Sequence, residues 1–353
     1  MAFCSALHFL RIGTWGSRHP AWRAKLHDKR RSAQLKGQAV VQPDPEDYDY
    51  DLDQALASMV GIRSVIPADA FTAETLGTER AGNGVVIRAD GVVLTIGYLI
   101  MEADTVWISH GRGHVVPGHV LGYDYESGLG LVQALGRLDL PALPVGCSGD
   151  AEIGEHVVVA GAGGRQGSIT ARIIARQEFA GYWEYVLDEA IFTAPAHPNW
   201  GGTALIGPGG DLLGVGSLQI QQAAQGGRGE DANMMVPIDL LRPIYNDLLT
   251  IGRPNRPARP WLGLYATEVE NNVAVLGIAS GGPAQSVDLQ AGDIVLAVAG
   301  ASVTTLASFF RGVWSLGNAG VDVPLLINRE GETFEVRVRS ADRRRFLKGP
   351  ILH

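Results

Sequence analysis

The feature that most constrains the fold is a series of short apolar segments, separated by glycine and aspartate, between residues 61 and 235. In one pair, Gly84-Val85-Val86-Ile87 and Val92-Val93-Leu94-Thr95 flank an Asp90-Gly91 turn, which is the arrangement of a β-hairpin. Segments spaced in this regular way are typical of an all-β sandwich or barrel pair. The pattern predicts a mainly β fold, and 46 glycines among 353 residues fit a chain with many tight turns.

The rest of the chain contains further predicted strands, one helix and a linker. Beyond the hairpin, strands are expected at 105–109, 129–132, 156–160, 185–187, 204–206 and 212–217. After Asp239, which suits a helix N-terminus, Leu240, Leu241, Ile244 and Leu248 recur at helical spacing and predict one helix. Residues 252–260 contain three prolines and three arginines, a composition that propagates neither helix nor central strand. This stretch is predicted to be a linker.

The segment after the linker has the pattern of an α+β module. Strands are expected at 273–278, 294–298, 323–327 and 334–338, with a helix near 306–316. The predicted organisation is a charged N-terminal extension (1–60), a β domain (61–251), a linker (252–260), an α+β domain (261–340) and a basic tail (341–353).

Charge and composition limit the classes of partner. The net charge of −8 argues against a protein that coats nucleic acid with its whole surface, because such binding needs Lys and Arg to neutralise phosphates. Residues 1–37 are rich in Lys and Arg, and a helix is plausible within 20–38, so an arm binding RNA or an anionic membrane is one hypothesis. The acidic run at 44–53 would compete for the same charges. A solvated or partner-docked arm is favoured, and neither nucleic acid nor membrane is an expected partner.

No cofactor or metal is expected. Cys4 and Cys147 are too few for a disulfide framework, and neither has metal-ligand spacing. His110, His114 and His119 could ligate a metal only if the backbone folded them together, so a solvated loop is the favoured interpretation. No stretch reaches the ~18 apolar residues of a membrane span, and the first ten residues lack the leading positive charge of a signal sequence. We expect a cytoplasmic protein.

Several motifs together resemble a known family. They are Gly82-Asn83-Gly84-Val85-Val86-Ile87, Asp90 to Thr95, Trp200-Gly201-Gly202-Thr203-Ala204-Leu205, Asp211 to Val215, Trp261-Leu262-Gly263-Leu264, Gly282-Pro283-Ala284 and Ala291 to Gly300. In order and spacing, residues 80–250 resemble the trypsin-like domain of the HtrA serine proteases, and residues 261–340 resemble the PDZ domain that follows it. The resemblance implies a trypsin-like double β-barrel joined to an α+β PDZ-like domain.

The resemblance also implies where a catalytic triad would lie. The family's histidine follows the Leu-Thr strand by three residues, where this chain has Tyr98; the aspartate position holds Gly128 and the serine position holds Gly201. Glycine offers neither nucleophile nor carboxylate, and a phenol with a pKa of ~10 is a poor base at neutral pH. We therefore expect no enzyme but a pseudoprotease that acts as a protein-binding, scaffolding or accessory subunit. The alternative is a relocated peptidase that uses His197 with Thr203 or Ser127.

The PDZ-like part predicts the binding site. Such a fold adds an extended peptide as a strand and holds its terminal carboxylate on backbone amides. The resemblance places the loop and first strand at Trp261, Leu262, Gly263, Leu264 and Tyr265, and the groove helix at Phe309, Phe310, Val313 and Trp314, about half of which must face the core. The expected partner is a peptide C-terminus or a protein, with a homo-oligomer or hetero-complex possible. The alternative is a PDZ-like fold that only packs against its own protease-like domain or a fixed subunit.

Overall fold

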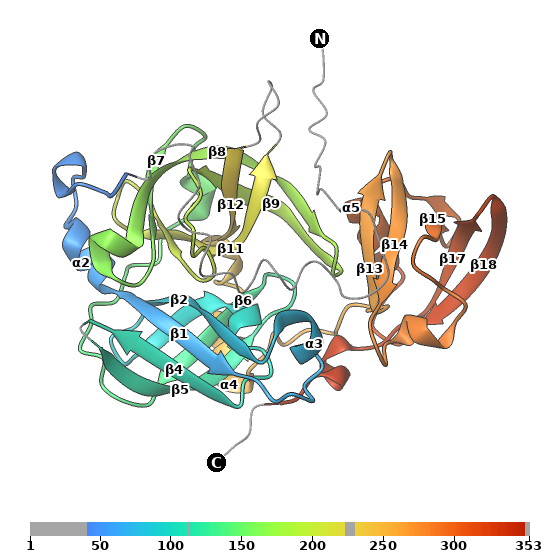
Figure 1. Ribbon diagram of the computed structural model, residues 1–353, viewed down its shortest axis with the longest axis horizontal. Coiled ribbons are helices and arrows are strands. Elements are labelled where there is room, and N and C mark those ends of the chain that lie inside the picture. The colour runs from blue at the N-terminus through green and yellow to red at the C-terminus, as the bar shows by residue number, and fades with distance from the viewer. Residues whose placement is uncertain (1–40, 112, 223–229, 350–353) are drawn as a thin grey trace, which may run out of the picture.

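The computed structural model describes residues 41–111, 113–222 and 230–349, and in these the chain forms two β-barrels and a separate domain of one sheet and a helix (Figure 1). The helix expected within 20–38, the basic arm and Cys4 lie outside the described residues. Among the residues that the structure describes, no helix is long and apolar enough to span a membrane. The mainly β fold predicted from the glycine-punctuated apolar segments is confirmed.

The first barrel closes in the order β1-β2-β3-β6-β5-β4, all antiparallel. Its strands are β1 (Met59–Val65), β2 (Glu79–Val86), β3 (Val92–Ile96), β4 (Thr105–His110), β5 (His114–Tyr123) and β6 (Leu129–Ala134). The predicted hairpin is β2 and β3, with Val85 opposite Leu94. Strand β5 occupies a region expected to be a loop, because glycine and histidine at its start hide the alternation that follows.

The second barrel closes in the order β10-β11-β12-β9-β8-β7. Its strands are β7 (His156–Ala160), β8 (Ser168–Gly181), β9 (Tyr185–Ala194), β10 (Ala204–Ile206), β11 (Leu212–Gln222) and β12 (Glu230–Pro237). The helix predicted after Asp239 is split: a 3-10 turn η5 (Ile238–Leu240) precedes α4 (Tyr245–Ile251). Strands β8 and β9 form a long hairpin that extends from this barrel toward the third domain (Figure 1).

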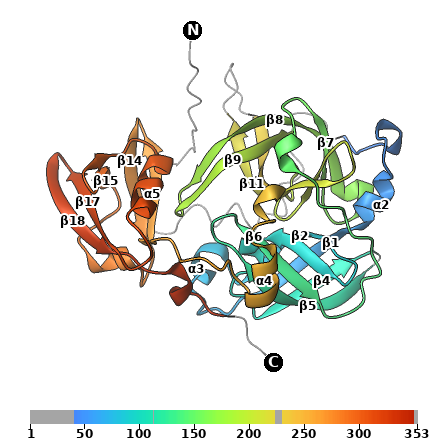
Figure 2. The same cartoon turned by 180° about the vertical axis from the view of Figure 1, so that it is seen from behind.

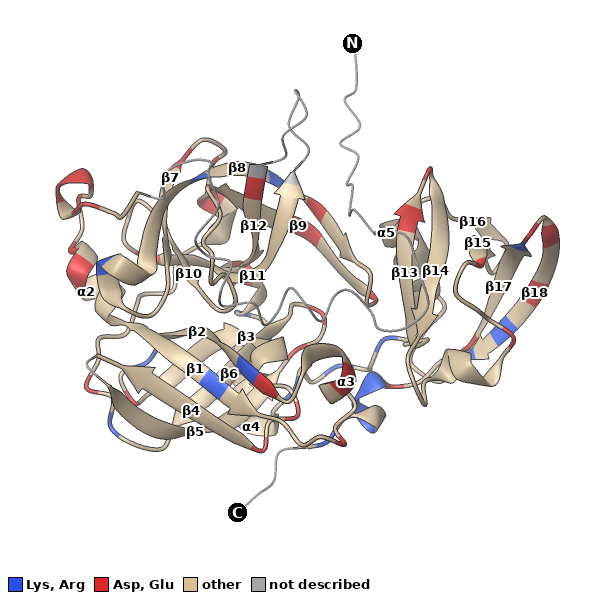
Figure 3. Ribbon diagram, in the orientation of Figure 1, with Lys and Arg blue, Asp and Glu red and all other residues tan. Residues whose placement is uncertain are grey.

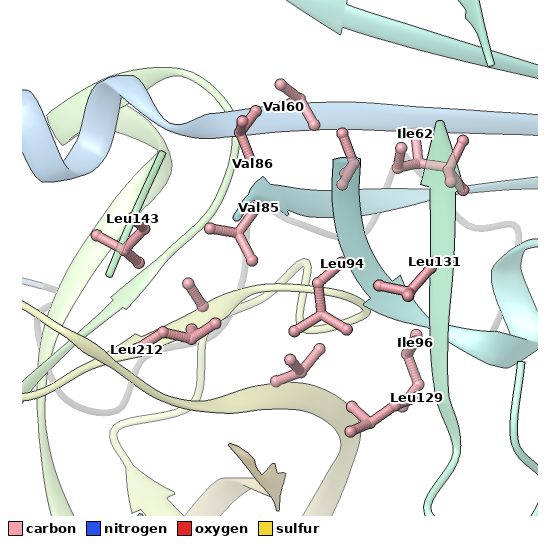
Figure 4. Close-up of a cluster of buried hydrophobic side chains, with 14 of the residues drawn as sticks. Val60, Ile62, Val85, Val86, Leu94, Ile96, Leu129, Leu131, Leu143 and Leu212 are labelled. Atoms are coloured by element: carbon pink, nitrogen blue, oxygen red, sulfur yellow. The ribbon is translucent and has the colours of Figure 1, made fainter. Parts of the chain in front are cut away.

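A single apolar cluster joins the two barrels. In Figure 4, Val85 and Leu94 of the first barrel lie between Leu131 on one side and Leu143 and Leu212 on the other, and all five are at most 2% exposed. Full burial of one such side chain contributes ~1.5–3 kcal/mol to stability. The barrels are thus held in a fixed arrangement, which fixes the residues at their junction.

The third domain is a strongly bent sheet covered by one helix (Figure 2). Its strands are β13 (Leu264–Val269), β14 (Asn272–Ile278), β15 (Ile294–Val298), β16 (Ala301–Ser302), β17 (Asp322–Arg329) and β18 (Glu332–Arg339). Helix α5 (Leu306–Ser315) begins with a capping box between Thr305 and Ser308 and buries Phe309 and Phe310. This part matches the predicted α+β module.

Two predicted boundaries differ from the structure. The extension was expected to run to residue 60, yet α2 (Leu52–Ala57) is capped by Asp51 and buries Leu52 and Leu56, and β1 begins at Met59. The crowded acidic residues around it mask this helical spacing. The predicted basic tail contains a 3-10 turn, η7 (Arg343–Phe346), that packs on the first barrel. Its Phe346 ring lies 6.1 Å from that of Phe71, which precedes the short helix α3 (Ala73–Leu76).

Candidate functional site

The structure brings the three positions assigned by the resemblance together at the junction of the barrels. The amide of Gly97, which begins the 3-10 turn η2 (Gly97–Leu99), donates to the carbonyl of Gly128 at 2.6 Å. The next residue, Tyr98, extends to the other barrel, where a Cβ placed on Gly201 would lie 2.6 Å from the Tyr98 hydroxyl. The phenol therefore fills the space into which a side chain at 201 would project.

The Tyr98 phenol is used to link the barrels. Its hydroxyl donates to the carbonyl of Ser217 at 2.9 Å. Burial raises the pKa of Tyr98 above its usual value, and a hydrogen bond to Trp200 lowers it by less. The phenol is therefore protonated at neutral pH and serves as a hydrogen-bond donor.

Asn83 is a junction residue to which the sequence analysis assigned no role. Its side chain, 6% exposed, donates to the carbonyl of Asn199 at 2.8 Å and accepts from the amide of Ala162 at 2.9 Å. Its own amide donates to the carbonyl of Gly201 at 2.8 Å. Asparagine suits this place because its side chain offers both a donor and an acceptor. A lone asparagine between Gly82 and Gly84 is the only sequence signal that could have pointed to it.

The side chains of the relocated-peptidase alternative are each engaged by backbone. His197 accepts at Nδ1 from the amide of Asn199 at 3.1 Å, and its Nε2 lies 2.9 Å from the carbonyl of Gly167. Burial lowers the pKa of His197 and outweighs these two hydrogen bonds, which raise it. Thr203 donates to the carbonyl of Trp200 at 2.9 Å, and Ser127 accepts from the amide of Leu129 at 3.2 Å. The geometry does not favour this alternative.

The packing of Tyr98 on Gly201 predicts non-additive stabilities. Gly201→Ala alone should lower the free energy of unfolding by about 2 kcal/mol, because the new methyl group overlaps the phenol oxygen. In a Tyr98→Phe background the oxygen is gone, and the same alanine should cost less than about 1 kcal/mol. Urea unfolding of the four proteins of this cycle measures both values, and equal costs of alanine in the two backgrounds would contradict the predicted contact.

The loop before β13 holds a carboxylate on three consecutive amides. The amides of Leu262, Gly263 and Leu264 donate to Oε1 of Glu184 at 3.2, 2.7 and 3.1 Å, and that of Leu262 also lies 3.1 Å from Oε2. Gly263 makes the convergence possible, because its φ of +74° is a left-handed conformation that favours glycine. Glu184 comes from the tip of the β8–β9 hairpin.

The electrostatics of Glu184 reflect two opposed effects. Burial raises the pKa of Glu184 to about 7, while the three amides and the charge of Arg343 lower it by less. Figure 3 shows acidic segments along the β8–β9 hairpin and basic segments in the nearby linker and η7. The sequence analysis did not single out Glu184. An acidic residue between Trp183 and Tyr185, just before a predicted strand, is the only trace of it in the sequence.

The predicted peptide-binding residues fall into two groups. Trp261 lies between the rings of Phe71 and Phe346, at 5.8 and 4.9 Å, and Tyr265 faces Tyr182 of the hairpin at 6.0 Å. The other three lie on α5: Phe310 and Val313 are 1% exposed in the core of the domain, and Trp314 lies beneath the Arg259 guanidinium at 4.5 Å. The structure thus gathers the loop residues on Glu184 and places the helix residues in the core or against the linker.

The other residues considered in the sequence are separate from both places. His110 and His114 are stacked with ring centroids 5.4 Å apart at the β4–β5 turn, and His119 lies further along β5. Cys147 donates to a carboxylate oxygen of Asp239 at 3.6 Å. Each lies on a turn or strand away from the barrel junction and the amide loop.

Comparison with known proteins agrees with this architecture. A family model described as a trypsin-like peptidase domain matches residues 82–215, and a PDZ domain model matches residues 260–339. The probable periplasmic serine endoprotease DegP-like of Pseudomonas fluorescens is 28% identical over 270 residues, which are 73% of this chain and 55% of that protein. The serine endoprotease DegS of Haemophilus influenzae is 27% identical over 242 residues, 66% of this chain and 69% of its own length.

The chain is similar to HtrA-type proteases in that a match to a trypsin-like peptidase domain is followed by a match to one PDZ domain. It is homologous to DegP and DegS, and it spans about half the length of the DegP-like relatives it matches. A solved structure, the HtrA-type protease AlgW with decapeptide, has a TM-score of 0.50 and 17% identity, covering 86% of this chain and 100% of that one. This likeness bears on the fold alone.

Two expectations from the sequence are contradicted by these comparisons. The chain was expected not to be an enzyme, yet its relatives are named serine endoproteases. That expectation depends on three positions, Tyr98, Gly128 and Gly201, and their equivalence to a triad stays a prediction. The cytoplasmic location is contradicted because the DegP-like relatives are named periplasmic. The cytoplasmic expectation was based on the weak resemblance of residues 1–10 to a signal sequence, and these residues lie outside the described part of the chain.

Proposed function

We propose that this HtrA-type chain recognises polypeptides with a free C-terminal carboxylate at its PDZ loop, and that it serves as a protein-binding or accessory subunit through this contact. The observation that carries the proposal is the set of three consecutive amides, from Leu262 to Leu264, that bind one carboxylate group. A PDZ domain implies binding of peptide or protein. Charge-assisted hydrogen bonds of this kind are about twice as strong as neutral ones.

The groove beside this loop supports an extended ligand. Strand β13 continues directly from Leu264 and offers backbone groups to an added strand, and α5 lies across from it. We propose Trp261 to Tyr265 as the strand side of the groove and Phe310, Val313 and Trp314 as the helix side.

The barrel junction is part of the same proposal. We propose Tyr98, Gly128 and Gly201 as the equivalents of the family's histidine, aspartate and serine. Because the relatives are named serine endoproteases, hydrolysis of the bound peptide should also be measured in this chain. Since two of the three positions have no side chain, hydrolysis here would use other groups of the junction.

The binding test uses a defined pool of peptides. Immobilised protein is incubated with hexapeptides whose last three residues are randomised, made with a free C-terminal carboxylate or with a C-terminal amide, and retained peptides are identified by mass spectrometry. We expect the protein to enrich the carboxylate pool at least about tenfold over the amide pool, because the amide cannot accept all three charge-assisted hydrogen bonds. Cleaved peptides in the same spectra would extend the function to hydrolysis.

A loop variant provides the control. In Gly263→Val the left-handed backbone is disfavoured, and the side chain would meet Trp261 and Pro283, so the three amides should no longer converge. We expect this variant to lose the preference for the carboxylate pool. Equal retention of both pools by the unaltered protein would refute the proposed function.

A further inference from the structure

The β8–β9 hairpin reaches into the PDZ groove as a ligand would. The amide of Ala266, on β13, donates to the carbonyl of Tyr182 at 3.0 Å, so backbone of the hairpin tip pairs with the groove strand. Val186, 8% exposed, is buried in the apolar cluster of the PDZ domain. On the other side, Arg311 of α5 forms ion pairs with Glu178 and, at 2.5 Å, with Asp188. The hairpin therefore lies between the two elements that form the groove.

Glu184 supplies the one group that a peptide C-terminus would bring. Its carboxylate takes all three amides of the loop, so a second carboxylate can bind these amides only after Glu184 has left them. The tip is a three-residue connection in which Glu184 has a φ of +61°. Glycine or asparagine is favoured at such a position, so a glutamate carries a conformational cost that the bound carboxylate offsets.

We propose that residues 182–186 are an internal ligand of the PDZ domain, and that a polypeptide with a free C-terminal carboxylate binds by displacing them. This inference rests on the proposed function, since it concerns regulation of the same amide loop. The groove alternates between two occupants of the same chemistry, the Glu184 side chain and the α-carboxylate of a partner. The apparent dissociation constant for the partner is its intrinsic value divided by the fraction of molecules whose groove is open.

The first test compares variants at the hairpin tip. Affinity for a fluorescein-labelled peptide taken from the enriched carboxylate pool is measured by anisotropy with the full chain. We expect Glu184→Ala to bind at least about tenfold more tightly than the unaltered protein, because the internal carboxylate is gone. Glu184→Gln, which retains an accepting oxygen, should keep the tip docked and bind the peptide more weakly than Glu184→Ala. Arg311→Ala should change affinity by about threefold or less, since its ion pairs are exposed.

The matched control is Glu330→Ala. Glu330 is also a glutamate with a left-handed φ, +52°, at the β17–β18 turn, but it is exposed and far from the groove in the sheet order. The Glu330→Ala variant should have the same affinity for the labelled peptide as the unaltered protein. If Glu184→Ala and Glu330→Ala both match the unaltered protein, the internal ligand is refuted while the proposed function stands. If none of these proteins prefers the carboxylate peptide over its amide, both proposals fail.

A second measurement needs no substitution. Amide hydrogen exchange of residues 180–186 is followed in the unaltered full chain with and without saturating carboxylate peptide. Displacement predicts at least about tenfold faster exchange in this segment when peptide is bound, while β10, in the barrel core, stays protected. Unchanged exchange at the tip under saturation would overturn the proposal, because the peptide would then bind beside the hairpin and not in its place.

Discussion

Replacing Gly202 by alanine should prevent the trypsin-like domain from folding stably. A Cβ on Gly202 would lie 1.9 Å from the carbonyl oxygen of Asn83 and 2.7 Å from the Thr95 hydroxyl, and the residue has a φ of +76°. The Asn83 carbonyl is fixed in β2, where it accepts from Thr95 at 2.6 Å. Relief would require the barrels to separate, so we expect a loss of more than about 4 kcal/mol, a large part of the ~5–15 kcal/mol that stabilises a typical domain.

Gly154→Ala is the control for this substitution. Gly154 also has a left-handed φ, +93°, but nothing lies within 4 Å of a Cβ placed there. Gly154→Ala should lower the free energy of unfolding by only about 1–2 kcal/mol, which is the cost of a left-handed backbone at a non-glycine residue. Soluble yield and urea unfolding followed by circular dichroism separate the two cases. Similar unfolding midpoints for Gly154→Ala and Gly202→Ala would show that the close approach at the junction is absent.

Raising the pH should weaken the internal ligand. The pKa of Glu184 is about 7 in the docked hairpin, raised by burial from its ordinary value of 4.5, so the docked state takes up a proton more readily than the released state. Docking is therefore favoured at low pH, and this contribution is lost as the pH rises from about 4.5 through 7. Between pH 5.5 and 8 the advantage of Glu184→Ala over the unaltered protein in peptide affinity should shrink by about tenfold.

The ratio of the two proteins isolates the hairpin, because the peptide's own carboxylate titrates equally in both measurements. The groups that face Glu184 are Arg343 from η7 and Tyr265 from β13. Burial raises the pKa of Tyr265 above its usual value, so its hydroxyl stays protonated between pH 5.5 and 8. An affinity ratio that does not depend on pH would mean that Glu184 has the same pKa whether the tip is docked or released.

Much of the fold could be predicted because the segments in question are short and bounded by strong turn signals. The strands β7, β10 and β15 begin and end where the sequence places them, each with a glycine or aspartate within two residues of either end. The strands β5, β8 and β12 were missed. Glycine and histidine interrupt the apolar pattern of β5, arginine interrupts that of β8, and the buried Asn233 interrupts that of β12. Only the closed barrel shows which way each of these residues faces.

The candidate site was predictable only where it is local in sequence. The loop from Trp261 to Leu264 is one contiguous motif, and its position follows from the sequence itself. Glu184 lies about 80 residues away and reaches the loop only through the long hairpin, so nothing near either segment indicates that they meet. Asn83 was missed for a related reason, because its partners at Asn199 and Ala162 belong to the other barrel.

The tethering of the hairpin tip to the same chain has a further consequence for selectivity. A ligand that cannot diffuse away competes at a constant effective concentration, however dilute the protein is. Dilution will therefore not empty the groove, and increasing the amount of this protein will not fill it more completely. Only the abundance of a polypeptide end, weighed against its affinity, decides whether it enters, so scarce or poorly fitting C-termini are rejected before any other step.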